Sequence, residues 1–371
     1  MATRAAAVDG VDGHAASSTR PYPQSWLDAI VGWIDRLPGP AWAAFVVIAV
    51  LAVAFIALEA ALSSRGLYGQ EPTYFGYAFF HVYPLAAYYF LSRGARGAVD
   101  AFRPATDADD VTAERWRLEL STTPARPAFA LLIFSAVGYV LLLATAPQGW
   151  DLVGHQPAFI LLRVVSEGLW LTPIAWVTVY LLFRQMRMVS ELHRSVVRVD
   201  LLQPEPLHAM STLTARGALV AVVLQLAIAL APLPNLSEGV RLTQAAFMLP
   251  LVGLSVAAFV LPLRGMQALL ATDRRRRLAV VNSRLDAALA TLHGVVNEEA
   301  VPTREENAAR LAQTRVDALN KAISSLLQER EFVTRQSTWP WDTGTFRAVA
   351  SAVLLPVVLF LVTRALERFV F

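Results

Sequence analysis

Two oppositely charged residues, Arg163 and Glu167, stand four positions apart within a long apolar run. Residues i and i+4 share one face of a helix, so these side chains can form an ion pair within a single helix. Ionisable groups inside a membrane-spanning helix cost free energy unless they are paired or hydrated, so they mark candidate functional sites. The interpretations that remain open are a structural ion pair that locks helices together, an Arg163 side chain that extends outward to the membrane surface, or the polar wall of a ligand or ion cavity.

An aromatic run over residues 74–91, with His81 near its middle, is the second candidate. Aromatic residues gather where membrane helices meet water, so a belt combined with helix packing is one interpretation. The other is an aromatic-walled cavity for a small molecule. In that case Tyr77 and His81 would form a ligand pocket together with Arg163 and Glu167. A metal site is not expected, since no second histidine or carboxylate shares the face of His81.

Other chemistry finds little support in the residue types. The chain has no cysteine, which excludes disulfides, thiol catalysis and thiolate metal sites. It has no phosphate-binding glycine loop, dinucleotide fingerprint, zinc-protease motif or nucleophile elbow in a plausible context. We therefore expect no catalytic residue, no metal and no cofactor, and we do not expect an enzyme.

Composition indicates a membrane protein. The 371 residues are 56% hydrophobic and only 16% charged, against about 25% charged in a soluble domain. The apolar residues come in blocks of roughly 20, the length needed to cross a hydrocarbon core about 30 Å thick. Lys321 is the only lysine beside many arginines, a bias that suits a high-GC bacterial source. We predict an all-α, multi-pass protein of the plasma or inner membrane.

The apolar blocks predict seven membrane-spanning helices. Basic residues concentrate in alternate connecting segments, which places the N-terminus in the cytoplasm and the C-terminus outside. Residues 1–24 read as a disordered leader, and 25–38 as an amphipathic interfacial helix that Ser25 can cap. The first six spans would form a bundle over 41–263, with cytoplasmic helix extensions near 184–215. The expected spans are 41–62, 74–91, 128–145, 157–183, 217–233, 246–263 and 346–366.

Residues 264–338 predict a cytoplasmic helical hairpin. Two heptad stripes of apolar residues, separated by a short loop, indicate antiparallel helices that are polar on their outer faces. Four consecutive arginines follow the sixth span and are expected to anchor it on anionic lipid headgroups rather than to bind nucleic acid. The stripes are Leu278, Val281, Leu285, Ala288, Leu292 and Val295, and then Ala312, Val316, Leu319, Ile323 and Leu326; the basic anchor is Arg274, Arg275, Arg276 and Arg277.

The final segment, 344–371, predicts the seventh span. Its first half is rich in small residues, which permits close helix approach. Four residues of one face would form a hydrophobic constriction if this helix lined a pore, and ordinary helix packing is the alternative. That face carries Ser351, Leu355, Val358 and Val362.

The order of these segments resembles the seven-transmembrane ion-channel superfamily of insect odorant and gustatory receptors. That family carries Thr-Tyr and Gln-Phe in its last span, where this chain has Thr345, Phe346, Arg347 and Ala348. No functional residue is therefore transferred. The resemblance implies a tetramer with a cytoplasmic anchor, a central pore lined by the seventh span, and a ligand pocket in the outer half of the bundle.

We therefore expect an oligomeric ligand-gated channel or chemoreceptor that assembles with copies of itself through 264–338 and 344–371. The lipid bilayer and a small-molecule ligand are the other expected partners, and nucleic acid is not. One alternative is a non-conducting sensor or scaffold whose hairpin binds a partner. A second alternative is a small-solute transporter.

Overall fold

The computed structural model describes residues 21–62, 71–145, 157–196, 205–230, 250–299, 306–339, 341 and 343–370. These residues form helices and no strand, which confirms the all-helical prediction for this part of the chain. The predicted leader lies outside it, apart from 21–24. The main helices are α1 (Trp26–Arg36), α2 (Ala41–Leu62), α3 (Glu71–Phe102), α4 (Asp110–Ser121), α5 (Ala125–Thr145), α6 (Pro157–Arg163), η2 (Val164–Leu171), α7 (Thr172–Leu192), α8 (Glu205–Leu230), α10 (Arg264–Glu299), α11 (Glu306–Arg335) and α12 (Thr343–Val370).

Five helical stretches in the described residues are long and apolar enough to cross a bilayer, which marks the chain as a membrane protein. Two predicted spans, 74–91 and 346–366, lie in α3 and α12 but are not among the five. Tyrosine, histidine and arginine lower the hydropathy of α3. In α12 the side chains are described without interruption only as far as Leu359, and the apolar stretch Thr343–Leu359 ends there. The count of seven spans thus stays a prediction. The five are Ala41–Leu62, Ala125–Thr145, Pro157–Leu192, His208–Ala227 and Pro250–Asn297.

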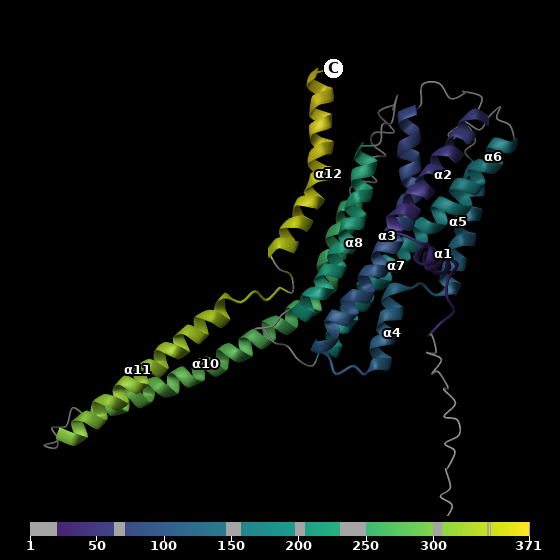
Figure 1. Cartoon of the computed structure of the whole chain (residues 1–371). Coiled ribbons are helices and arrows are strands. Elements are labelled where there is room, and N and C mark those ends of the chain that lie inside the picture. The colour runs from purple at the N-terminus through teal and green to yellow at the C-terminus, as the bar shows by residue number, and fades with distance from the viewer. Residues whose placement is uncertain are drawn as a thin grey trace, which may run out of the picture.

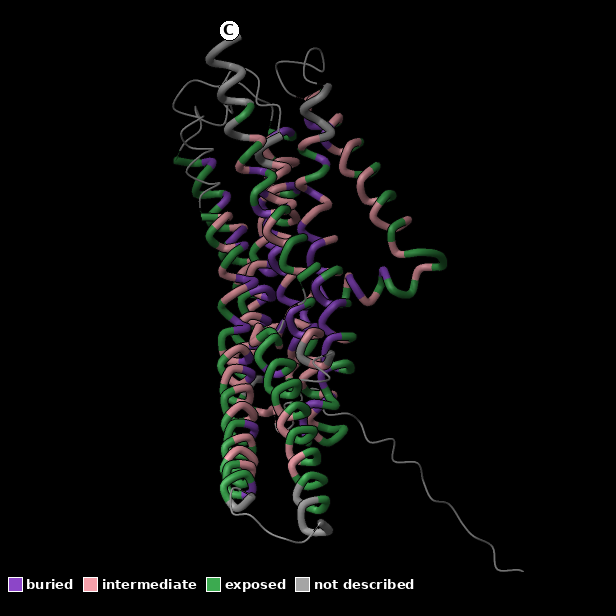
Figure 2. Tube along the Cα trace, turned by 90° about the vertical axis from the view of Figure 1, so that its left-hand side faces the viewer, coloured by how far each residue is buried: buried purple, intermediate pink, exposed green. Residues whose placement is uncertain are grey.

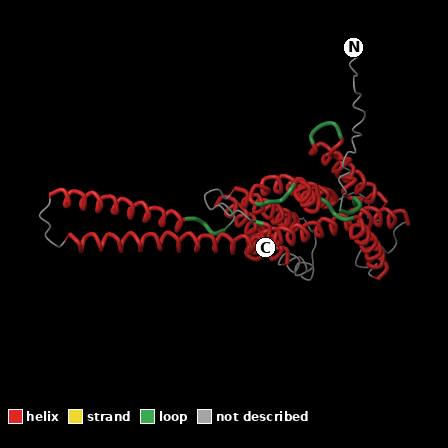
Figure 3. Tube along the Cα trace, turned by 90° about the horizontal axis from the view of Figure 1, so that it is seen from below, coloured by secondary structure: helices red, strands yellow, loops and turns green. Residues whose placement is uncertain are grey.

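The apolar helices stand side by side in one bundle (Figure 1). Helices α10 and α11 leave the end of the bundle that carries α4 and project obliquely as a long hairpin, whereas the C-terminus lies at the opposite end. Buried residues gather inside the bundle, and the hairpin is mostly exposed (Figure 2). The view from below shows the hairpin extending to one side as two neighbouring helices (Figure 3).

Helix α1 packs its apolar face on the protein. A capping box of Ser25 and Asp28 begins the helix, as the sequence allows. Leu27 and Ile34 are buried in a cluster with residues of α3 and α7, among them Leu85. The face expected to lie in lipid is thus covered by other helices, and the position of α1 relative to a bilayer remains a prediction.

The Asp28 carboxylate joins α1 to two other segments. It accepts hydrogen bonds from the Ser25 hydroxyl at 2.7 Å, the Tyr88 hydroxyl at 2.6 Å and the Thr123 amide at 3.1 Å. Buried carboxylates need such donors, because removing the charge from water is costly. Asp28 therefore fixes α1 against α3 and against the segment that precedes α5.

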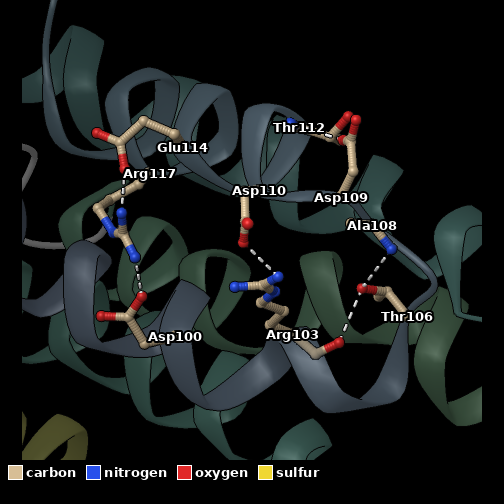
Figure 4. A network of polar contacts seen from close by, with 9 residues as sticks. All are labelled: Asp100, Arg103, Thr106, Ala108, Asp109, Asp110, Thr112, Glu114 and Arg117. Atoms are coloured by element: carbon tan, nitrogen blue, oxygen red, sulfur yellow. Dashed lines mark hydrogen bonds and ion pairs between the residues drawn. The ribbon is translucent and has the colours of Figure 1, made fainter. Parts of the chain in front are cut away.

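A polar network folds the segment between α3 and α4 (Figure 4). The Arg117 guanidinium on α4 pairs with Asp100 on α3 and with Glu114 one turn earlier. Arg103, at the start of a short 3-10 turn, pairs with Asp110 at 2.5 Å. These contacts are partly exposed, so each contributes little stability. Their combined effect is to hold α4 along the end of α3.

The hairpin buries the described residues of its two heptad stripes between its own helices, and the side chain of Ala312 lies outside the described part. Val281 and Val295 of α10 are buried, and Val316, Leu319, Ile323 and Leu326 of α11 are half-buried. Arg274 also joins the two helices, because its guanidinium donates to the Thr334 carbonyl. The outer faces are exposed, as expected for a hairpin that stands in water.

Candidate functional site

A π-helical segment, η2, interrupts the long helix that contains the Arg163–Glu167 pair. The helix runs without a break from α6 through η2 into α7, and the Thr172 amide donates to the Glu167 carbonyl five residues earlier. Such segments are rare and occur frequently at functional sites. Within η2, Gly168 lies against α5: a Cβ at this position would come within 3.0 Å of the Tyr139 ring. Glycine therefore permits the close approach of α5.

Arg163 and Glu167 form an ion pair across this junction. Their side chains are only 19% and 12% exposed, so the two charges are largely removed from solvent. Tyr139 of α5 donates its hydroxyl to the second carboxylate oxygen of Glu167 at 2.7 Å. Both carboxylate oxygens are thus occupied, and the pair neutralises itself.

Glu59 brings a second carboxylate to the same region from α2. Ser166, the neighbour of Glu167, donates its hydroxyl to Glu59 at 2.6 Å, and both residues are buried. Glu59 lies close enough to Arg163, Glu167 and His81 to interact electrostatically with all three. Among the described residues no cation pairs directly with Glu59. The second carboxyl group of the cluster therefore has only a neutral hydrogen-bond donor.

His81 of α3 faces this cluster with its ring fixed in orientation. Its Nδ1 lies 2.8 Å from the carbonyl oxygen of Tyr77, which can only accept, so Nδ1 carries the hydrogen. In the neutral imidazole, Nε2 is then an acceptor. Nε2 is buried and has no hydrogen-bond partner among the described residues. The Trp170 indole donates to the His81 carbonyl at 3.0 Å and so joins α3 to η2.

A groove of about 290 Å³ lies between α2, α3 and η2. Of the four residues predicted to form a ligand pocket, His81 lines it, and the other three do not. Arg163 and Glu167 belong to the adjoining buried pair, and Tyr77 lies close enough to Arg163 to interact with it electrostatically. The structure thus gathers the four into one region but gives them different roles. The groove is lined by Ile48, Leu51, Ala52, Phe55, His81, Val165, Ser166 and Trp170.

The sequence interpretation missed the partners that complete this region. Glu59 is the only ionisable residue of its span, so the rule that singled out Arg163 and Glu167 would also have selected it. Ser166, Tyr139 and Trp170 carry no comparable signal, because serine and aromatic residues are common in membrane helices. Their involvement follows from the packing of α5 and η2.

The face of α12 proposed to line a pore is bare in the single chain. Leu355, Val358 and Val362 are 49–51% exposed, and Ser351 is exposed as well. The opposite face carries the buried Val353. Helix α12 packs chiefly on α8, and it stands at the edge of the bundle (Figure 1).

Stacked aromatic rings join the hairpin to the bundle and to α12. Trp339 and Trp341 lie between α11 and α12 with their ring centroids 4.2 Å apart. Trp341 also stacks on Phe259, which precedes α10, at 4.9 Å, and on Phe346 of α12 at 5.7 Å. The start of α12 is thus attached to the helix that leads into the hairpin.

The four consecutive arginines lie on α10 within the hairpin. Arg277 pairs with Asp273 at 2.8 Å, and Arg274 contacts α11 as described above. Arg275 and Arg276 are exposed. Two of the four side chains therefore serve contacts inside the hairpin, and two are accessible to a charged surface.

No family model, curated protein or solved structure matches the chain. Among the described residues, no group of three or more histidine and acidic side chains is placed to hold a metal ion. Two features remain as functional candidates: the groove beside His81 and the bare face of α12.

Proposed function

We propose that the protein is a multi-pass protein of the plasma or inner membrane that assembles into a symmetric oligomer, a tetramer, and conducts ions in response to a ligand. In this assembly α12 lines a central pore. The observation that carries the proposal is the bare apolar face of α12, Ser351, Leu355, Val358 and Val362, on a helix that packs through its other side on α8.

The chemistry of that face suits a gate. Three of its four residues are branched apolar side chains, and a ring of such residues around an axis excludes water until it widens. The first turns of α12 carry the small residues Ala348, Ala350 and Ala352, which allow copies of the helix to approach closely. Ser351 adds to this face a polar group that can contact a passing ion.

The proposed topology has seven spans, a cytoplasmic N-terminus and a cytoplasmic hairpin. Positive charge in the connecting segments supports it, as does the departure of α4 and the hairpin from the same end of the bundle (Figure 1). In this arrangement the stacked rings around Trp341 transmit movement from the bundle and hairpin to the start of α12. The groove beside His81 would then be the ligand site.

Two variants that differ by one position test the role of α12. Val358 belongs to the bare face, whereas the adjacent Val357 is half-buried and points elsewhere on the helix. Valine and threonine have nearly the same shape, so each replacement changes polarity alone. We expect Val358→Thr to increase single-channel open probability in planar bilayers, because a wetter constriction conducts more readily. Val357→Thr should leave it unchanged.

Equal effects of the two variants, or no current above that of protein-free bilayers, would contradict a pore along α12.

The assembly is tested separately by ending the chain before Thr303, which removes α11 and α12. Native mass spectrometry should then show the loss of oligomers. The same stoichiometry as the full chain would exclude assembly through these segments.

A non-conducting sensor or scaffold is the second candidate, and exposed apolar side chains on the hairpin favour it. Val280, Leu311, Leu327 and Phe332 are exposed although the heptad stripes are packed. Unpaired apolar surface of this kind can dock another protein. If the protein forms oligomers that carry no current, this candidate replaces the channel.

A further inference from the structure

The groove between α2, α3 and η2 offers hydrogen-bond acceptors and no free donor. Three polar side chains line it, and each already donates its hydrogen within the protein. His81 Nδ1 donates to the Tyr77 carbonyl, the Ser166 hydroxyl to Glu59, and the Trp170 indole to the His81 carbonyl. What remains for a ligand is the lone pair of His81 Nε2 and those of Ser166 Oγ. A molecule that binds here must donate hydrogen bonds.

His81 Nε2 is the stronger of these two acceptors. The residue is 6% exposed, and Nε2 has no hydrogen-bond partner among the described residues. Leaving a buried acceptor unsatisfied costs free energy, and native structures rarely tolerate it. A donor that reaches Nε2 from the groove removes this cost. The unsatisfied nitrogen therefore indicates that a ligand binds here and that this ligand donates a hydrogen bond.

A carboxyl group behind the groove favours a cation. Arg163 and Glu167 neutralise each other, whereas the Glu59 carboxyl group is held only by the neutral Ser166 hydroxyl. A cation in the groove would favour the carboxylate form of Glu59, and in a medium of low dielectric the two would attract each other far more strongly than in water. The side chains of Phe55 and Trp170 also line the groove, and aromatic faces attract ammonium groups.

The remaining walls are apolar and set the size of the ligand. Ile48, Leu51 and Val165 line the groove, and Leu51 and Val165 are exposed on the outer surface of the bundle. The groove therefore opens toward the side that faces lipid in a membrane. Its volume of about 290 Å³ lies at the lower end of the ~300–1,000 Å³ typical of small-molecule sites.

We propose that this groove binds a small apolar primary amine in its ammonium form. The ammonium group donates to His81 Nε2 and to Ser166 Oγ and lies near the Glu59 carboxyl group. The hydrocarbon part lies along Ile48, Leu51 and Val165. This assignment deepens the ligand site named above, but it requires neither a pore along α12 nor an oligomer.

Four probes of equal chain length test the assignment on the purified full-length chain in detergent. Hexylamine, 1-hexanol, hexyltrimethylammonium and hexanoate are each titrated while thermal unfolding is followed. A ligand that binds only the folded state raises the Tm with a saturating dose dependence. We expect hexylamine to do so and the other three to have no saturating effect, because they lack the charge, the N–H donors or both.

Three outcomes of this titration would overturn the proposal. If 1-hexanol matches hexylamine, the charge has no role; if hexyltrimethylammonium matches it, the hydrogen bonds have none. Absence of any hexylamine effect overturns it equally. Because conduction is not measured, each of these failures leaves the pore proposal for α12 standing.

Variants locate the site. His81→Phe removes the acceptor and retains a ring, so we expect the Kd for hexylamine to rise at least about tenfold, the effect of losing a hydrogen bond to a charged group. His293→Phe, the same change on the exposed surface of α10, should leave it unaltered. Ser166→Ala should weaken binding as well. Unchanged affinity in His81→Phe would refute the site. If this variant does not fold, the ranking of the four probes on the natural chain decides whether the groove binds an ammonium group.

Discussion

Replacing Glu167 by leucine removes the acceptor that Arg163 and Tyr139 share. Both charged side chains are at least four-fifths buried, so the change leaves the Arg163 guanidinium without its partner in a medium that hydrates it poorly. Breaking a buried ion pair from one side costs about 3–5 kcal/mol. Arg163 retains some exposure and its attraction to Glu59, which favours the lower end of that range.

The Tyr139 hydroxyl adds a second cost. It donates to Glu167 at 2.7 Å and is buried, so losing the acceptor costs about 1 kcal/mol more. Together the two effects predict that Glu167→Leu lowers the free energy of unfolding by about 4 kcal/mol, roughly a thousandfold in the folding equilibrium. Equilibrium unfolding in mixed micelles, followed by tryptophan fluorescence, measures this difference.

Two comparisons make the reasoning refutable. Arg187 and Glu191 on α7 form a pair with the same spacing and chemistry, but their side chains are 83% and 54% exposed. Glu191→Leu should therefore cost under about 1 kcal/mol. The double variant Arg163→Met with Glu167→Leu removes both charges and should recover about 2–3 kcal/mol of the loss. Equal costs for Glu167→Leu and Glu191→Leu, or no recovery in the double variant, would show that burial of the pair is not what makes it matter.

Two further substitutions test the packing of the bundle by the same unfolding assay. Gly168→Ala should lower the free energy of unfolding by about 1–2 kcal/mol, because the new Cβ meets a Tyr139 ring held by its hydrogen bond. Gly138→Ala, whose new Cβ meets nothing within 4 Å, should be neutral or slightly stabilising. The reverse order would contradict the close approach of α5. Asp28→Asn should lower the free energy of unfolding by about 2–4 kcal/mol, because an amide nitrogen would then face the donors of Ser25, Tyr88 or Thr123. Asp110→Asn, in an exposed pair, should change it by less than about 1 kcal/mol. A similar cost at both positions would argue against a special role for buried Asp28.

Local sequence pattern sufficed for the features that depend on neighbours along one helix. Spacing of four predicts the Arg163–Glu167 contact, because one helical face is determined by the chain itself. The heptad stripes around Val281 and Ile323 likewise predict the packed hairpin. The capping box at Ser25 is also local.

Local pattern did not reveal where apolar surface would be buried. The amphipathic face of α1 is equally suited to lipid and to protein, because both are apolar. Only the positions of α3, α5 and α7 put Leu27 and Ile34 inside the protein.

Composition and periodicity by themselves determined that this chain is a helical membrane protein with a polar hairpin. The bilayer thickness sets the length of an apolar segment and the helical repeat sets the spacing of its residues, so both can be recognised within one segment. The site was decided by tertiary structure. Glu59 reaches Ser166 across 107 positions of sequence. The π-helical turn forms where α5 packs against Gly168. His81 lines a groove whose other wall is α2. Contacts between distant segments depend on how helices pack, and a single sequence carries no direct record of that packing.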